Sequence, residues 1–151
     1  VTTYSAEQLP EFLNQTRLIV NLLPRTPDTQ GILNKALFDQ LQKGAYLINI
    51  ARGAHLVEAD LLEALDSGQL KAATLDVFAS EPLSRQHVFW QRTEITITPH
   101  ISAITQPQTT MDQICSRLLA FQAGEPISGI VDIIKGYCVS SNIKRERKGG
   151  L

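Results

Sequence analysis

Arg52, Glu81 and His100 each come a few residues after a short run of apolar residues, and Asp76 lies near the end of one such run. A guanidinium is a planar, permanently charged group that can grip a carboxylate with two parallel hydrogen bonds. An imidazole beside a carboxylate is a general acid near neutral pH, because the negative charge favours the imidazolium form. Together these side chains could hold an organic acid and donate a proton to it.

Each of these residues alone has an ordinary structural explanation. Arg52 could be a surface cation and Glu81 an exposed loop acid. His100 could be a turn histidine, and Asp76 could cap nearby backbone amides. A catalytic role is favoured over these structural roles because all four residues fall at the same end of the predicted strands. The strand pattern is identified without reference to these residues. In that arrangement Arg52 would bind the carboxylate of a 2-oxo acid, and His100 would protonate its carbonyl oxygen as a hydride arrives.

The elements that must position these residues follow from the apolar pattern. Short apolar or β-branched runs predict strands at residues 18–23, 45–50, 72–77 and 95–98. Helical periodicity predicts helices at residues 5–15, 34–42, 58–67 and 108–121. Strands that alternate with helices are typical of an α/β fold with a parallel sheet, in which ligands bind at the carboxyl ends of the strands.

The first two elements carry more specific expectations. Residues 18–23 are almost continuously apolar, which is typical of a strand buried on both faces of a sheet. Ser5 and Gln8 have the spacing of a capping box at a helix start. Pro10 indicates that the α-helix begins later than Ser5, because a proline beyond the first turn removes a backbone hydrogen bond.

Composition predicts one soluble, cytoplasmic domain without nucleic-acid or membrane partners. The chain has 151 residues, of which 43% are hydrophobic, enough for a single core. Its net charge of −1 creates no field that would attract nucleic acid or an anionic membrane. The two cysteines are expected to be free thiols in a reducing compartment. We find no apolar run of about 18 residues and no signal-peptide layout.

The three histidines do not indicate a metal site. His55, His87 and His100 are scattered along the chain, without the paired spacing of metal ligands on one face. His55 falls near a predicted helix start and His87 in a polar loop. Both are expected to be exposed to solvent.

Four strings in order along the chain resemble the signatures of the D-isomer-specific 2-hydroxyacid dehydrogenases. They are residues 23–29 (LPRTPDT), 47–53 (LINIARG), 75–82 (LDVFASEP) and 98–100 (TPH). Residues 89–90 (FW), 102–105 (SAIT), 131–132 (VD) and 135–137 (KGY) look most like the glyoxylate/hydroxypyruvate reductase A branch. Four ordered motifs are a far more specific signal than one glycine pattern.

The resemblance implies a role for each motif residue. Arg52 would bind the substrate, Glu81 would raise the pKa of the histidine, and His100 would donate the proton. The positions that would bind the cofactor are Leu23, Pro24, Ala51, Arg52, Asp76, His100 and Ala103. The implied cofactor is NADP or NAD, with NADPH favoured, the implied substrate is glyoxylate or hydroxypyruvate, and the complete protein would be a homodimer. Ser102 and Ala103 stand where many family members have two glycines.

The chain also lacks parts of the family pattern. No Gly-x-Gly-x-x-Gly follows a strand, so the backbone cradle for the cofactor pyrophosphate is missing. The expected architecture is therefore the second half of a Rossmann-type domain, incomplete at its N-terminal side. Residues 1–122 would belong to the nucleotide-binding domain, 123–137 would pack on a substrate domain, and 138–151 would be a disordered tail. Such a chain alone should bind cofactor weakly, turn over little and self-associate through an open strand edge.

Three alternatives stay open from the sequence. The substrate could be another 2-oxo acid, such as phosphohydroxypyruvate, and Trp90 is a local hint that more plausibly packs a loop. Corepressor proteins of the same fold share these residues and act by binding partners. The missing phosphate loop favours a non-catalytic remnant.

Overall fold

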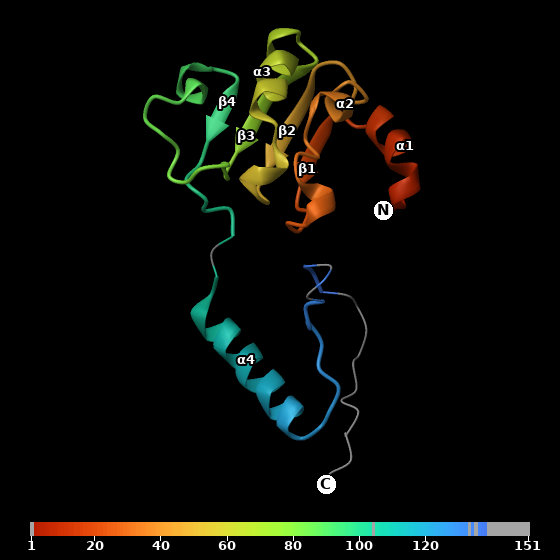
Figure 1. Ribbon diagram of the computed structural model, residues 1–151, viewed down its shortest axis with the longest axis vertical. Coiled ribbons are helices and arrows are strands. Elements are labelled where there is room, and N and C mark those ends of the chain that lie inside the picture. Colours follow the sequence, from red (N-terminus) through yellow and green to blue (C-terminus); the bar gives the residue numbers. More distant parts are fainter. Residues whose placement is uncertain (1, 104, 133, 135, 139–151) are drawn as a thin grey trace. The chain divides into compact units, whose positions relative to one another are not determined.

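The computed structural model describes residues 2–103, 105–132, 134 and 136–138 (Figure 1). The chain divides between Ser102 and Ala103 into two compact units. The first unit contains every strand of the sheet, and the second contains one long helix.

The first unit is built on a four-stranded parallel sheet. Its strands are β1 (Leu18–Asn21), β2 (Ala45–Asn49), β3 (Leu70–Leu75) and β4 (Ile95–Ile97). They lie side by side in the order β1-β2-β3-β4, and every neighbouring pair is parallel (Figure 1). The predicted α/β class with a parallel sheet is confirmed. β3 begins and ends two residues earlier than predicted, so Asp76 directly follows the strand.

Helices connect the strands. The α-helices of this unit are α1 (Leu9–Asn14), α2 (Lys35–Phe38) and α3 (Glu58–Asp66). The 3-10 helices are η1 (Ala6–Gln8), η2 (Pro27–Thr29), η3 (Gly53–His55) and η4 (Val88–Gln91). As Pro10 indicates, the α-helix begins after Ser5, whose backbone N–H instead donates to Gln8 Oε1 at 3.1 Å.

α2 is shorter than the predicted helix over residues 34–42. Asn34 caps it, because its side-chain oxygen accepts the Leu37 N–H at 3.1 Å. After this helix the backbone hydrogen bonds of Gln40 and Leu41 span three residues, as in a tight turn, instead of four. The Gln42 N–H then donates to the carbonyl of Thr16. The chain therefore leaves the helix axis one turn early, where it meets the end of α1.

One apolar core lies between the sheet and its helices. α3 contributes Leu61 and Leu65, which are buried as the helical periodicity predicts. The core also includes Leu13, Leu37, Phe38, Leu47, Leu70, Leu75 and Phe89. This core fixes the sheet, and with it the loops that leave the carboxyl ends of the strands.

The prediction that residues 18–23 form a strand buried on both faces is wrong. Leu18 and Val20 are 53% and 43% exposed, and the residues between and after them in β1 are buried. β1 is an edge strand of the described sheet, and within the first unit the face that carries Leu18 and Val20 is exposed. The strand also ends at Asn21, because the Leu23 N–H donates to the Asn21 side chain.

The second unit contains α4 (Pro107–Gln122), which agrees with the predicted helix to within one residue at each end. Pro107 opens the helix and Gly124, with a φ of 75°, follows its end. Neither α4 nor any other helix in the described part of the chain is long and apolar enough to cross a membrane. Apart from Cys138, the predicted tail at residues 138–151 lies outside the described residues.

Candidate active site

Three of the four chemically useful residues lie in loops that leave the same edge of the sheet. Arg52 comes three residues after β2, Glu81 six residues after β3, and His100 three residues after β4. Because the strands are parallel, their carboxyl ends share one edge, and all three loops begin there.

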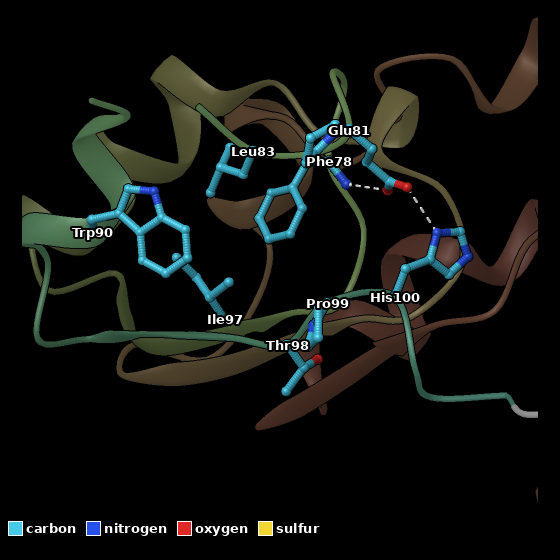
Figure 2. Close-up of a pocket in the computed structure, with 9 residues that line it drawn as sticks. Phe78, Glu81, Leu83, Trp90, Ile97, Thr98, Pro99 and His100 are labelled. Carbon is cyan, nitrogen blue, oxygen red and sulfur yellow. Dashed lines mark hydrogen bonds and ion pairs between the residues drawn. The ribbon is translucent and has the colours of Figure 1, made fainter. Parts of the chain in front are cut away.

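Glu81 and His100 form a hydrogen-bonded pair. Glu81 Oε2 lies 2.8 Å from His100 Nδ1, and Glu81 Oε1 accepts the backbone N–H of Phe78 at 2.9 Å (Figure 2). The bond to His100, and after it the bond from Phe78, lowers the pKa of Glu81, although partial burial opposes this. Glu81 is therefore an ionised acceptor, and Nδ1 carries the proton between them. Nε2 remains as the nitrogen that can face a ligand.

Asp76 anchors the segment that carries His100. Asp76 is only 1% exposed. Its carboxylate accepts the Thr98 hydroxyl and the backbone N–H groups of Ile101 and Ser102, the latter two at 2.9 and 3.0 Å. Burial raises the pKa of Asp76, but the hydrogen bonds from Ser102, Thr98 and Ile101 together hold it far below its usual value. The buried group is thus a charged anchor for residues 98–102.

His100 itself has an unusual backbone conformation. Its φ is 55°, in the left-handed region that residues other than glycine and asparagine seldom adopt. Such a conformation costs about 1–3 kcal/mol and persists only where the surroundings impose it. The Asp76 bonds on both sides of His100 supply that constraint.

One hollow brings the predicted residues together. A cavity of about 270 Å³ is lined by Arg25, Arg52, Gly53, Ala54, Phe78, Ala79, Glu81 and His100. The guanidinium, the carboxylate and the imidazole that the sequence singles out thus border the same space. The convergence expected from the strand pattern is present in the structure.

The hollow carries an excess of positive charge. The one carboxylate that lines it, Glu81, is already bonded to His100. Arg52 donates one hydrogen bond, to the carbonyl of Ala51 at 2.6 Å, and among the described residues neither Arg52 nor Arg25 forms an ion pair with an acid. Two guanidiniums without carboxylate partners make the hollow suited to an anion. Arg25, within residues 23–29, was not predicted as a site residue, and its charge was the available signal.

Gly53 allows the hollow to close. A Cβ at this position would lie 1.9 Å from the backbone carbon of Phe78, closer than atoms can approach. The glycine after Arg52 therefore lets the loop after β2 press against the loop after β3, which brings Arg52 to Glu81.

A second pocket shares Phe78, Glu81 and His100 with the hollow. It measures about 480 Å³, and Figure 2 shows Trp90 at one end of it and His100 at the other. Its wall is mainly apolar, with Phe78, Leu83, Trp90, Ile97 and Pro99. The Trp90 indole N–H donates to the carbonyl of Ser84 at 2.8 Å, so this side chain closes its own loop, as the sequence suggests.

The remaining predicted cofactor residues lie near the strand ends or in the second unit. Leu23 and Pro24 are exposed after β1, and Ala51 is buried after β2. Ala103 is the first residue of the second unit.

The prediction that the two other histidines are exposed to solvent is wrong for His55 and holds only in part for His87. His55 is fully buried and bonds to Asn21 on β1. The side chain of His87 is only 22% exposed, and its Nε2 lies 3.2 Å from Glu58. His87 follows the polar residues 84–86, and its bond to Glu58 leaves it partly buried. His55 ends η3, where its tertiary contacts bury it.

Comparison with known proteins places this geometry in a family. Residues 1–102 match the family described as D-isomer specific 2-hydroxyacid dehydrogenase, NAD binding domain. The chain is 60% identical over 132 residues to a glyoxylate/hydroxypyruvate reductase A of Serratia proteamaculans, covering 87% of this chain and 42% of that protein. The same-named protein of Yersinia enterocolitica is 54% identical, covering 91% and 44%. The chain thus spans well under half the length of these relatives.

Solved structures agree. An NADPH-dependent glyoxylate/hydroxypyruvate reductase from Sinorhizobium meliloti, solved with NADP and sulfate, has a TM-score of 0.84 and 42% identity, over 89% of this chain and 44% of that one. A D-isomer specific 2-hydroxyacid dehydrogenase from Xanthobacter autotrophicus Py2, solved with NADPH and MES, has a TM-score of 0.82 and 41% identity, over 87% and 55%. The chain belongs to the D-isomer specific 2-hydroxyacid dehydrogenase family, and residues 1–102 represent its NAD-binding domain.

Proposed function

We propose that this chain is part of an enzyme that reduces a small 2-oxo acid, glyoxylate or hydroxypyruvate, to the 2-hydroxy acid with a nicotinamide cofactor. The observation that carries the proposal is the hollow in which Arg52 lies with the Glu81–His100 pair. An anion-binding cation beside a proton donor is what this reaction requires. The names of the relatives that match the chain at 60% and 54% identity support the choice of substrate.

In the proposed mechanism Arg52 binds the substrate carboxylate and polarises the neighbouring carbonyl group. His100 donates the proton from Nε2 to the carbonyl oxygen, and Glu81 holds the ring through Nδ1. When bound, the cofactor supplies the hydride. The residues that we propose to hold the cofactor are Leu23, Pro24, Ala51, Arg52, Asp76, His100 and Ala103. Exposed Leu23 and Pro24 at the strand end offer the apolar surface that a flat ring needs.

NADPH is the proposed cofactor. The S. meliloti and X. autotrophicus relatives were solved with NADP or NADPH. No Gly-x-Gly-x-x-Gly stands in these 151 residues, so we propose that another segment of the complete protein binds the pyrophosphate. Residues 1–122 would then form part of the nucleotide-binding domain, and residues 123–137 would pack on the substrate domain. The complete protein would be a cytoplasmic homodimer.

Complementation tests this proposal. The chain is mixed with the N-terminal part of the S. proteamaculans relative to give a complemented complex, and glyoxylate-dependent NADPH oxidation is measured. We expect turnover from the complex, little from the chain alone, and none when the chain carries His100→Asn. A complex that assembles and binds NADPH without turnover would instead support a non-catalytic remnant or a corepressor-like binding protein.

A second substrate class is favoured by Arg25. Its guanidinium adds a second cation to the hollow, which suits a 2-oxo acid with a second anionic group, such as phosphohydroxypyruvate. In the complemented complex, Arg25→Gln should then reduce kcat/KM for the phosphorylated acid by about tenfold and leave glyoxylate nearly unchanged. Arg17→Gln, outside the hollow, is the control. Equal effects on both substrates would rule out a role for Arg25 in choosing between them.

A further inference from the structure

A buried cluster of uncharged polar side chains lies beneath the Arg52 side of the hollow. Asn21 ends β1, Asn49 ends β2, and His55 ends η3. Their exposed fractions are 4%, 0% and 0%. Asn21 and Asn49 are direct partners in the register of β1 and β2, so their side chains meet between the two strands. Buried polar groups are costly unless they bond to one another, which these do.

The hydrogen bonds of Asn21 fix the protonation of His55. The Asn21 side-chain oxygen accepts the Leu23 N–H at 3.1 Å, so its amide nitrogen faces the cluster. That nitrogen donates to Asn49 Oδ1 at 3.0 Å and lies 2.9 Å from His55 Nδ1. Nδ1 must accept this bond, so the neutral ring carries its hydrogen on Nε2. His55 Nε2 has no hydrogen-bond partner of normal geometry among the described residues.

The surroundings of His55 agree with a neutral ring. Burial is the largest influence and lowers its pKa, and the positive charges of Arg52 and Arg25 lower it further. The backbone carbonyl of Pro24 acts in the opposite direction. A buried ring close to two guanidiniums has little to gain from a charge of its own.

The cluster holds the backbone of both loops on this side of the hollow. Asn49 Oδ1 accepts the Ala51 N–H at 3.3 Å, and Asn49 Nδ2 donates to the Arg52 carbonyl at 3.2 Å. The His55 backbone N–H donates to the same carbonyl at 3.2 Å. The Arg52 backbone is thus held by two donors while its side chain stays exposed. On the other loop, the bond from Leu23 to Asn21 performs the same task.

We propose that Asn21, Asn49 and neutral His55 are positioning residues that set the backbone of Arg52 and Leu23, and through it the placement of the anion-binding guanidinium. The importance of Arg52 and Leu23 rests on the proposed function, but the cluster and its protonation do not. The three residues contact neither substrate nor cofactor and act through the loops that they hold.

The protonation is tested first, on the wild-type 151-residue chain. Nitrogen-15 NMR of the histidine rings at neutral pH should show His55 with a bare Nδ1 and a protonated Nε2. The side-chain amide hydrogens of Asn21 should exchange slowly with solvent. A proton on His55 Nδ1, or a doubly protonated ring, would overturn the proposal without reference to catalysis.

Positioning is tested next in the complemented complex. His55→Leu removes the acceptor for Asn21, and kcat/KM for glyoxylate should fall about 10- to 100-fold, mainly through a rise in KM, because small displacements of a binding group are costly. His55→Gln offers an oxygen acceptor and should recover most of the loss. His87→Leu is the matched control, because His87 is outside the cluster and does not line the hollow, and its kcat/KM should stay within about twofold of wild type.

Asn21→Asp tests the positioning role of the cluster if the His55→Leu variant does not fold. The carboxylate still accepts the Leu23 N–H but cannot donate to His55, so the proton should move to Nδ1 and kcat/KM should fall. Unchanged kcat/KM in folded Asn21→Asp, or a His55→Gln variant as impaired as His55→Leu, would show that the cluster serves stability alone. A wild-type complex that assembles and binds NADPH without turnover, with the expected His55 tautomer, would refute the proposed function but not the hydrogen bonds and protonation of the cluster.

Discussion

The two sides of the hollow are held by different kinds of buried polar group: an ionised carboxylate on one side and a neutral cluster on the other. On the β3–β4 side, ionised Asp76 accepts two backbone N–H groups and a hydroxyl from the segment that carries His100. On the β1–β2 side, the neutral cluster of Asn21, Asn49 and His55 holds the segment that carries Arg52. The two anchors are adjacent, because the Asp76 N–H donates to the carbonyl of Asn49 at 3.0 Å.

The difference suits the charge that each side presents. A carboxylate beneath the histidine adds negative charge on the side where a proton is held. Beneath Arg52 and Arg25 an ionised carboxylate would pair with the guanidiniums and compete with an incoming anion. A neutral anchor holds the loop without that competition, and the comparison predicts that the two sides respond differently to substitution and to pH.

The largest effect is expected from His100→Asn. Asparagine tolerates the left-handed backbone at this position, so the segment should keep its fold while the proton donor is lost. We expect kcat of the complemented complex to fall about 10²- to 10⁴-fold, with a much smaller loss of NADPH affinity, because His100 is only one of the residues proposed to hold the cofactor. Steady-state kinetics and calorimetry measure the two quantities. A kcat within a few-fold of wild type would remove His100 from the mechanism.

Asp76→Asn should give the next largest effect. Its amide group must turn an N–H donor toward the N–H of Ile101 or Ser102, and an unmatched buried donor costs about 1–3 kcal/mol of unfolding free energy. Urea unfolding of the chain measures this loss. Asp66→Asn is the control, since its ion pair with Arg92 is largely exposed on the acid side and should matter by less than about 1 kcal/mol. Equal losses in both variants would contradict an anchoring role for Asp76.

Mild acid should weaken the His55 anchor but not the Asp76 anchor, and this effect should be smaller than those of the two substitutions above. The pKa of His55 is lowered in the folded chain, so its contribution to stability is complete above its unfolded value of about 6.5 and declines as the pH falls below it. The pKa of Asp76 is also lowered, and its contribution declines only below about pH 4, the unfolded value for aspartate.

Urea midpoints between pH 7.5 and pH 5 measure this difference. Wild type should lose stability over the interval, and His55→Gln should lose less. Asp76→Asn should show the wild-type slope from a lower starting value. If His55→Gln and wild type had the same slope, His55 would not be the group that responds to mild acid.

The sequence predicts the strands and the hollow better than it predicts the anchors. Arg52, Glu81 and His100 could be placed together because parallel strands end at one edge, and apolar runs reveal where strands end. The prediction that β1 is buried on both faces was wrong, because a continuous apolar run does not show whether both faces of the strand are covered.

The cluster of Asn21, Asn49 and His55 was not predicted, for a different reason. Asn21 and Asn49 are 28 residues apart and meet only through the register of β1 with β2. His55 stands in a short 3-10 helix, whose burial depends on packing and has no periodic signal in the sequence. A polar residue inside an otherwise apolar run was the available hint, and it occurs in both runs, residues 18–23 and 45–50.

Arg52 and His100 are proposed to act on one anion in one hollow. In the complemented complex with NADPH, nitrogen-15 NMR can follow the Arg52 guanidinium and the His100 ring as oxamate, an unreactive mimic of a 2-oxo acid, is added. We predict that both signals shift with the same Kd while the Arg17 signal, from outside the hollow, stays in place. Shifts of Arg52 without His100, or two different Kd values, would contradict the account.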